Sequence, residues 1–489
     1  MEDELLLVTG GLLFLAVGAA WAASRISVPT LVAFLGLGML LGSDGVGGIE
    51  FSDAGLAREI GVICLVAILF EGGLTTRISD TRPVAVPAVL LGTVGVVVTA
   101  VVIGAAARVL FDLSWSEGLL LGAVVGSTDA AAVFATLRQT GVRPRLGAAL
   151  EAESGINDPM AVALTLGLIS WVSEPDYGAW DMALLLVQQL GIGLVFGVVI
   201  GVAAAWAFAR LPERLAPFAP IFSLACAAVG FGAAAIVGGS GFLAVYLVGV
   251  LFGNATSPHR GTVASFHEGI AFLSQIVLFI VLGLLVFPSD LIGVIVSGVI
   301  LAAVLTLVAR PLAVAISTLG FSFSMQERAL LSWAGLRGAV PIVLATFPLS
   351  EGLVESETIF NAVFFVVLVS VLLQGTTLSW VAERLGLAED RPLHHNAPID
   401  PHVMRSMGSD ALEYVVQEDD DVAGTPVREL RLPEGALVAV IIRGDEAIPP
   451  RGSTVIQPGD RLYIIARGEV QQEVMERLAA WGAEPKQQE

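Results

Sequence analysis

Long apolar segments dominate the first 390 residues of the sequence. A membrane-spanning helix needs about 20 mostly apolar residues, and thirteen segments are candidates. Their centres lie near Phe14, Leu35, Leu65, Val97, Val125, Leu164, Val195, Ala227, Val248, Val277, Val299, Val340 and Val367. The segment from Gly241 to Gly253 is short, and fusing it with a neighbour would lower the count to twelve. With 55% hydrophobic and 14% charged residues, the composition excludes a soluble globular protein.

The composition changes to ordinary mixed polar sequence beyond about Asp390. We therefore expect a transmembrane domain over residues 1–390, a Pro- and His-containing linker over 391–401 and a small soluble domain over 402–489. The net charge of −20 argues against nucleic acid as a partner. Cys64 and Cys226 lie within apolar segments, which predicts buried thiols rather than a disulfide or a cysteine metal cluster.

Arginines collect in alternate loops between the apolar segments. One set of loops contains Arg25, Arg77, Arg82, Arg138, Arg143, Arg145, Arg210, Arg214, Arg260, Arg328 and Arg384. The other set is acidic, apart from Arg58 and Arg108 near the ends of their segments. Because positively charged loops stay in the cytoplasm, the N-terminus is expected outside and the C-terminal domain in the cytoplasm. We expect a multi-pass protein of the cell (inner) membrane.

Ionisable side chains stand inside several apolar segments. They are Glu71, Asp129, Glu153, Asp158, Arg310 and Arg337. A charge at the bilayer centre costs roughly 2.5–3.5 kcal/mol or more, so each is a candidate functional residue. At about 1.5 Å of rise per residue, Asp129, Asp158 and Arg337 lie roughly 15–18 Å deep, near the membrane midplane. Glu71 is expected nearer the cytoplasmic half.

The segment around Asp158 carries two polar stripes. Helical spacing places Glu153 beside Asn157 and Ser154 beside Asp158. Pro159 follows Asp158 and cannot donate a backbone hydrogen bond, which predicts a loosened helix, and Pro341 after the string GLRGAV predicts the same. Broken helices at mid-membrane depth are typical of transporter binding sites.

Structural alternatives stay open for most of these residues. Glu153 and Arg337 form either an architectural ion pair or part of a functional network. Arg310 either extends toward the membrane surface, guides ions or pairs structurally, and Asp129 is one candidate partner. The hydroxyls of Thr128 and Ser154 bond either to helix backbone or to a cation. Glu71 is either a buried protonated acid or a functional carboxylate.

Three strings, GSTDAAAV, ESGINDPMAV and GLRGAVP, occur in this order and resemble those of the NhaP-type branch of the monovalent cation:proton antiporters. The strings FEGGL around Glu71 and QGTT from Gln374 to Thr377 also match this branch in position. The resemblance implies an all-α polytopic fold of about thirteen helices, with a core and a dimerisation domain. It also implies inverted repeats whose unwound helices cross beside the site, and a homodimer.

The resemblance also implies roles for individual residues. Asp158 would bind the cation or the proton, with Thr128, Asp129, Ser154 and Glu71 as the other candidate cation- and proton-binding residues, while Glu153, Asn157 and Arg337 would form a stabilising network. The electrogenic branch has a second aspartate where this chain has Asn157, so electroneutral exchange of one K⁺ or Na⁺ for one H⁺ is expected. Because burial disfavours the charged form of a carboxylate, exchange should depend steeply on pH.

The C-terminal region shows a β, α, β, β, β, α pattern of alternating apolar strands and turn signals. It resembles a TrkA-C (RCK-C) domain, an α/β module, which implies dimerisation and a site for a small regulatory ligand. No GxGxxG string precedes it, so NAD is not expected, and no other cofactor is predicted. Because RCK-C modules usually accompany potassium transport, K⁺ is favoured over Na⁺.

A gated monovalent cation channel is the alternative from another functional class. It would need a selectivity filter, but the nearest string, TVGV from Thr93 to Val96, lies inside a continuous apolar segment. A membrane enzyme is less favoured because the HExxH, GxSxG and CxxC signatures are missing. The sequence therefore predicts an antiporter, and no enzymatic activity is expected.

Overall fold

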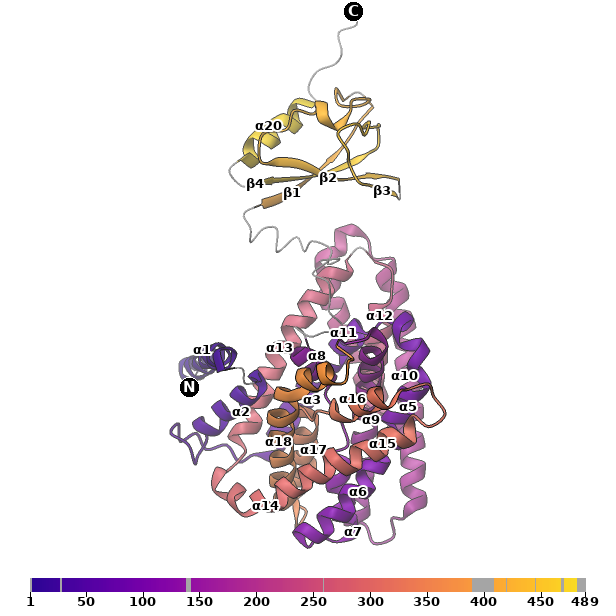
Figure 1. Ribbon diagram of the computed structural model, residues 1–489. Helices are drawn as coiled ribbons and strands as arrows, with labels where there is room; N and C mark the ends of the chain where they lie inside the picture. Colours follow the sequence, from indigo (N-terminus) through magenta and orange to yellow (C-terminus); the bar gives the residue numbers. More distant parts are fainter. Residues whose placement is uncertain are drawn as a thin grey trace, which may run out of the picture. The chain divides into compact units, whose positions relative to one another are not determined.

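A computed structural model describes residues 2–26, 29–137, 142–257, 259–388, 409–418, 420–444, 446–467 and 470–481 (Figure 1). The chain divides into two compact units, Met1–Arg391 and Pro392–Glu489. The predicted linker, 391–401, lies outside the described residues. Each unit is described by itself.

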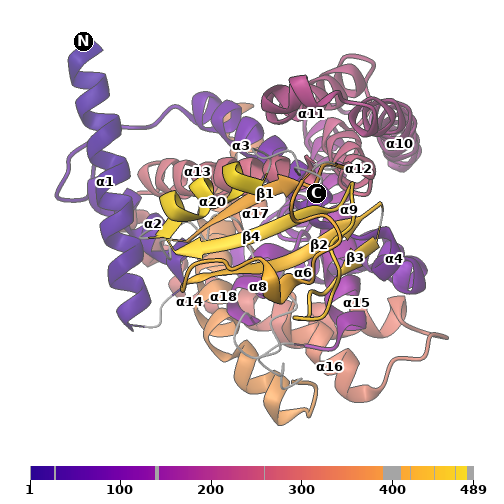
Figure 2. The same ribbon diagram turned by 90° about the horizontal axis from the view of Figure 1, so that it is seen from above.

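The first unit is a bundle of helices. Their bounds are α1 (Glu2–Ile26), α2 (Thr30–Leu41), α3 (Ala54–Thr75), α4 (Ile78–Thr81), α5 (Ala85–Gly92), α6 (Val94–Phe111), α7 (Trp115–Val124), α8 (Ala130–Leu137), α9 (Pro144–Ser173), α10 (Ala179–Ala209), α11 (Ala219–Ile236), α12 (Gly241–Gly253), α13 (Arg260–Leu284), α14 (Pro288–Val304), α15 (Arg310–Ser317), α16 (Met325–Trp333), α17 (Ala339–Ser350) and α18 (Ser356–Arg384). A π-helical turn, Leu305–Ala309, joins α14 to α15. In Figure 2, α10, α11 and α12 lie together, and α1 stands at the opposite edge beside α2.

The helices account for the apolar pattern of the sequence. Among the described residues, seven stretches are long and apolar enough to cross a membrane: Ile78–Phe111, Pro144–Ser173, Ala179–Ala209, Arg214–Ile236, Arg260–Leu284, Pro288–Ser317 and Ser356–Arg384. Shorter apolar helices, including Thr30–Leu41 and Gly241–Gly253, supplement them. All predicted centres except Val125 lie inside helices, and Val125 lies just after α7. The number of membrane crossings stays a prediction.

Two breaks interrupt the helices at the centre of the bundle. The first, from Val125 to Asp129, separates α7 from α8, and the second, from Ala334 to Gly338, separates α16 from α17. Pro341 lies in the first turn of α17, where a missing N–H costs little because that group has no partner within the helix. The loosening predicted at Pro159 is wrong. Helix α9 is continuous through Pro159, because one lost hydrogen bond does not break a helix that buried packing holds on both sides.

The second unit is a four-stranded antiparallel sheet with one helix. Strands β1 (Ser409–Val415), β2 (Ala436–Arg443), β3 (Glu446–Ile448) and β4 (Arg461–Arg467) follow the order β1-β4-β2-β3, and α20 (Gln471–Trp481) packs on the sheet (Figure 1). The predicted first helix is only a 3₁₀ turn, Val427–Glu429. Pro426 and Pro433 bracket this segment, and the residue before a proline avoids the α region, so no longer helix forms.

Candidate functional site

The two helix breaks contact each other. The backbone N–H of Asp129, in the first break, donates to the carbonyl oxygen of Leu336 in the second, with N and O 2.8 Å apart. A Cβ atom at Gly338 would overlap the Asp129 carboxylate, so glycine permits this close approach. Breaks at this depth leave backbone groups without helical partners. Side chains from α9 and α18 supply many of those partners.

Asp158, on α9, faces the first break. Its side chain is buried, and its Oδ1 accepts a hydrogen bond from the Ser127 hydroxyl at 2.6 Å. The Ser127 carbonyl oxygen accepts from Nη1 of Arg337, also at 2.6 Å. Ser127 therefore joins the carboxylate of one helix to the guanidinium of the other break. Sequence reasoning missed Ser127, although it lies in the same string as Thr128 and Asp129.

Asn157 and Ser154 hold the backbone of the first break. Nδ2 of Asn157 donates to the Thr128 hydroxyl at 2.5 Å, and the Thr128 N–H donates to Oδ1 of Asn157 at 3.3 Å. The Ser154 hydroxyl donates to the Thr128 carbonyl oxygen at 2.6 Å. The structure thus brings Ser154, Asn157 and Asp158 to one segment, as their helical spacing predicted. The hydroxyls of Thr128 and Ser154 both contact protein groups.

Asp129 begins α8. Its Oδ1 accepts a hydrogen bond from the Ala132 N–H at 3.0 Å, which satisfies one of the free donors of the first helical turn. Asp129 and Asp158 lie close enough to interact electrostatically. The site therefore contains two neighbouring carboxylates, of which Asp129 is bonded to backbone and Asp158 to a single hydroxyl.

Glu153 forms an ion pair with Arg310. The two guanidinium nitrogens of Arg310 donate to the two carboxylate oxygens of Glu153, with Nη2 and Oε2 2.9 Å apart. Nη2 also donates to the Leu331 carbonyl oxygen at 3.1 Å. Both side chains are at least 96% buried, so Arg310 does not extend toward the surface. Of the alternatives left open for Arg310, structural pairing is therefore confirmed, with Glu153 rather than Asp129 as the partner. A direct ion pair of Glu153 with Arg337, the other open alternative, is not among the described contacts.

The second break is held by α18. The Arg337 N–H donates to the Ser370 hydroxyl at 3.1 Å, and Nε2 of Gln374 donates to the Trp333 carbonyl oxygen at 3.0 Å. Ser370 also donates to Gln374. Arg337 is 1% exposed and lies near enough to Glu153 and Asp158 for electrostatic interaction. The QGTT string therefore positions the break that carries Arg337.

Glu71 lies in a different group of residues. Its carboxylate, on α3, is half-buried and interacts electrostatically with Glu268 of α13 and Glu151 of α9. Among the described contacts, no hydrogen bond or ion pair joins it to the residues that contact Asp158. Its role in cation or proton binding stays a prediction. Among the described residues, no cluster of three His, Cys, Asp or Glu side chains could hold a resident metal ion.

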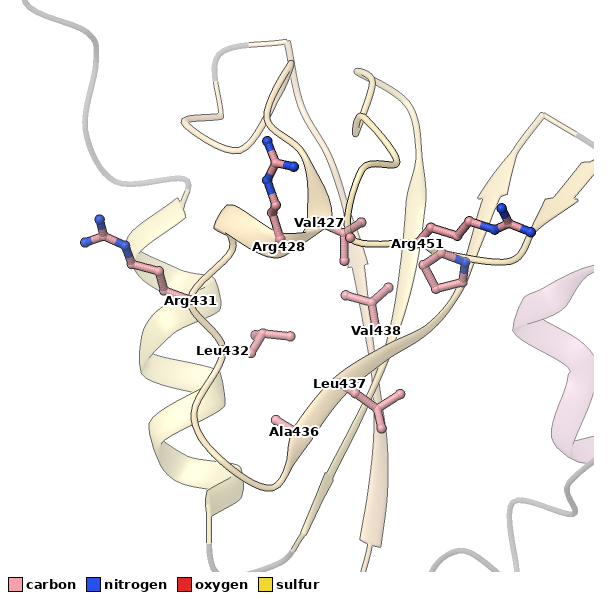
Figure 3. A pocket seen from close by; sticks show the side chains of 10 residues that line it. Val427, Arg428, Arg431, Leu432, Ala436, Leu437, Val438 and Arg451 are labelled. Atoms are coloured by element: carbon pink, nitrogen blue, oxygen red, sulfur yellow. The ribbon is translucent and has the colours of Figure 1, made fainter.

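A depression of about 300 Å³ opens in the second unit (Figure 3). Its lining includes the apolar residues Val427, Leu432, Ala436, Leu437 and Val438, although more of the exposed lining surface is polar than apolar. Arg428, Arg431 and Arg451 stand at its border, and their guanidinium groups point in different directions in Figure 3.

Arg443 and Asp460 form an ion pair elsewhere in the second unit, in which the Asp460 side chain is buried and the Arg443 side chain is one-third exposed. Nε and Nη2 of Arg443 each donate to one carboxylate oxygen of Asp460 at 2.8 Å. Burial of Asp460 opposes its ionisation, but hydrogen bonds from Arg443 and from the Gln457 N–H hold its pKa below the usual value.

Comparisons with known proteins identify the families to which the two units belong. Residues 12–384 match the sodium/hydrogen exchanger transmembrane family, and residues 411–479 match the TrkA-C domain. The K(+)/H(+) antiporter NhaP2 of Shewanella baltica is 40% identical over 453 residues, which cover 91% of this chain and 78% of that protein. The K(+)/H(+) antiporter NhaP of Alkalimonas amylolytica is 38% identical over 466 residues, 94% and 81% of the two chains.

A more distant relative and a solved structure extend the comparison. The Na(+)/H(+) antiporter ApNhaP of Aphanothece halophytica is 32% identical over 346 residues, which cover 67% of this chain and 65% of that protein. The sodium proton antiporter MjNhaP1 of Methanocaldococcus jannaschii shares the fold, with a TM-score of 0.69 and 24% identity over 79% of this chain and 99% of that one. None of these similarities supports the channel alternative. The chain belongs to the sodium/hydrogen exchanger family, as a multi-pass membrane cation/proton antiporter of the NhaP type with a TrkA-C domain.

Proposed function

We propose that this antiporter exchanges one monovalent cation for one proton at Asp158, without net charge movement. The observation that carries the proposal is the Asp158 carboxylate, which is buried beside a helix break and bonded to a single hydroxyl. The neighbouring Asn157 is an amide that holds Thr128. A carboxylate that binds either a proton or a cation, but not both, couples the two fluxes. Rocking of one part of the bundle against the other would alternate its access.

Oxygen atoms around Asp158 would complete the cation shell. Ser127, which donates to Asp158, and Asp129, which interacts with it electrostatically, are the first candidates. The hydroxyls of Thr128 and Ser154 would hold the backbone of the break in which these two residues lie. Glu71 stays a candidate cation- or proton-binding residue, in its own group with Glu151 and Glu268. In this account Glu153 acts with Arg310, and Asn157 and Arg337 stabilise the two breaks.

Potassium is the favoured cation in this proposal. The two relatives named K(+)/H(+) antiporters above each match more than 90% of the chain, whereas the relative named a Na(+)/H(+) antiporter is 32% identical over 67% of it. The TrkA-C domain is consistent with potassium transport and regulation. Oxygen ligands alone do not separate K⁺ from Na⁺.

A transport assay tests the role of Asp158. The full chain is reconstituted in liposomes, and internal pH is followed with a fluorescent probe while K⁺, Na⁺ or Li⁺ is added. The wild type should move protons in response to K⁺ more than to Na⁺, and Asp158→Asn should abolish the response. Asp44→Asn is the matched control, because Asp44 lies in an exposed loop and bonds Ser289. Full exchange by Asp158→Asn would contradict the assignment, and voltage-driven flux without proton movement would favour a channel.

We also propose a homodimer in the inner membrane, with the N-terminus outside and the TrkA-C domain in the cytoplasm. The placement of arginines supports the orientation. The dimer rests on the likeness to NhaP-type antiporters, and the apolar outer face of α10, with Val187, Val195, Val199 and Trp206 each at least 59% exposed, is available for it. Light scattering of the purified protein should give the mass of two chains, and the mass of one chain would contradict the dimer.

A second proposal concerns regulation through the TrkA-C domain. The depression in Figure 3 would bind a small anionic ligand with an apolar or aromatic part, because three arginines and several apolar side chains line it. AMP is a suitable probe, with adenosine and inorganic phosphate as controls. AMP should raise the unfolding temperature of the full chain and Arg431→Met should remove that effect. Equal responses to AMP in both proteins would contradict the site.

A further inference from the structure

The aromatic ring of Tyr246 lies directly on the backbone of Gly155. Tyr246, on α12, is 7% exposed. A Cβ atom at Gly155 would overlap three carbons of its ring, so only glycine allows the ring to lie against α9 at this point. The contact joins α12 to the helix that carries Asp158.

Gly155 lies between two carboxylates on one face of α9. Glu151 precedes Gly155 by four residues and Asp158 follows it by three, so helical spacing places all three on one face. Tyr246 is near enough to interact electrostatically with both carboxylates. The ring therefore covers the turn of α9 that separates Glu151 from Asp158.

The hydroxyl of Tyr246 lies at the Glu151 side of the ring. It is 3.5 Å from the Thr76 hydroxyl, and the Thr76 hydroxyl donates to Oε1 of Glu151 at 2.9 Å. Glu151 interacts electrostatically with Glu71 as well. Hydroxyl and carboxylate oxygens thus gather on one side of the ring, while Asp158 and Ser127 lie on the other.

The backbone of Tyr246 is held in place by close packing of α12 on α3. Cβ atoms at Gly73 or at Gly249 would overlap backbone of the opposite helix, so the two helices touch at these glycines. The contact of α12 with α9 is different. There the Tyr246 ring lies on Gly155, and no hydrogen bond joins Tyr246 to Gly155 among the described contacts. Because Gly155 has no side chain, the Tyr246 ring can shift along α9 without displacing interdigitated side chains.

We propose that Tyr246 is the barrier between Asp158 and the membrane side on which Glu151 lies, and that Glu151 is the last carboxylate a cation passes before that barrier. The inference rests on the proposed role of Asp158 in transport. In this structure the ring closes the route on the Glu151 side. Exchange then requires α9 and the Tyr246 ring to move past each other, which Gly155 permits.

Chemical access to the two carboxylates tests the barrier separately from transport. The purified full chain is treated with a water-soluble carbodiimide and an amine, and mass spectrometry gives the ratio of modified Asp158 to modified Glu151. In the wild type Glu151 should react and Asp158 should react far more slowly. Tyr246→Ala should raise the ratio at least tenfold, while Tyr246→Phe should keep the wild-type ratio because the ring remains.

Controls separate loss of the barrier from general loosening. Tyr177→Ala changes a tyrosine beyond the other end of α9 and should leave the ratio unchanged. An unchanged ratio in Tyr246→Ala would overturn the proposal, and so would an equal rise in Tyr177→Ala. The transport role of Asp158 can fail on its own. In that case Asp158→Asn retains exchange, whereas Tyr246→Ala, in a protein that keeps Asp158, still raises the labelling ratio.

Gly155→Ala provides a second test if Tyr246→Ala does not fold. The added methyl group would press on the ring, so exchange should fall at least tenfold in maximal rate. Gly147→Ala on the same helix is the matched control, since its Cβ would lie 3.4 Å from Phe134, an ordinary contact. Wild-type exchange by Gly155→Ala would contradict the inference.

Discussion

The buried pair of Glu153 and Arg310 permits a quantitative prediction. Removal of one partner leaves the other as an uncompensated charge in the core of the bundle. Such a loss costs about 3–5 kcal/mol in stability. We therefore expect Arg310→Met and Glu153→Gln each to destabilise the protein by about this amount. The double variant removes both charges together and should recover most of the loss.

An exposed ion pair of the same residue types provides the control. Arg58 and Glu351 are 3.1 Å apart, and their side chains are 35% and 53% exposed. An exposed pair contributes about 0–1 kcal/mol, so Arg58→Met should have a small effect.

Unfolding of the purified full chain in mixed detergent, followed by far-UV circular dichroism, measures all four variants. Single-variant losses below about 1 kcal/mol would refute the reasoning. So would a double variant whose loss equals the sum of the two single losses, because that result means that the two charges do not stabilise each other.

Two further predictions concern hydrogen bonds. Ser127→Ala removes the hydroxyl that donates to Asp158, and a hydrogen bond to a charged group is worth about 1.5–3 kcal/mol. The apparent cation affinity should therefore fall by roughly 10–100-fold in the liposome assay. An unchanged affinity would contradict this prediction. The pKa of Asp460 is lower in the folded than in the unfolded state. Its pairing therefore stabilises the TrkA-C domain at pH values above the unfolded pKa, and this stabilisation is lost as the pH falls through the folded pKa. Arg443→Met should reduce that acid dependence, which hydrogen exchange of β4 in the full chain measures; the same pH profile in both proteins would contradict it.

Spacing along a single helix could be predicted well from the sequence. The positions of Ser154, Asn157 and Asp158 follow from 3.6 residues per turn, and all three side chains contact the first break. Depth in the membrane, which hydropathy predicts from each segment in the same way, stays a prediction. These properties depend on one helix at a time, so the sequence alone is sufficient for them.

Partners on different helices could not be predicted in this way. Depth along the membrane normal does not tell which helices are neighbours, so Glu153 was paired with Arg337 although Arg310 holds it. For the same reason the sequence could not show that Glu71 interacts with Glu151 and Glu268. The π-helical turn before Arg310 also changes the direction of that side chain, and no single residue type marks such a turn.

The location of the helix breaks was only partly predictable. The second break lies next to Pro341, as expected, whereas the first contains no proline and runs from Val125 to Asp129. It depends on bonds from Asn157, Ser154 and Leu336, which replace the helical hydrogen bonds of its backbone. Tertiary contacts of this kind are absent from a hydropathy profile.

The stoichiometry of exchange tests the central claim most directly. Liposomes that contain the wild-type protein are placed under opposed K⁺ and H⁺ gradients, and the pair of gradients that stops net proton movement is determined at several clamped voltages. One titrating carboxylate predicts that flux stops when the two concentration ratios are equal, whatever the voltage. A zero-flux point that moves with voltage would mean unequal numbers of protons and cations per cycle and would contradict the account.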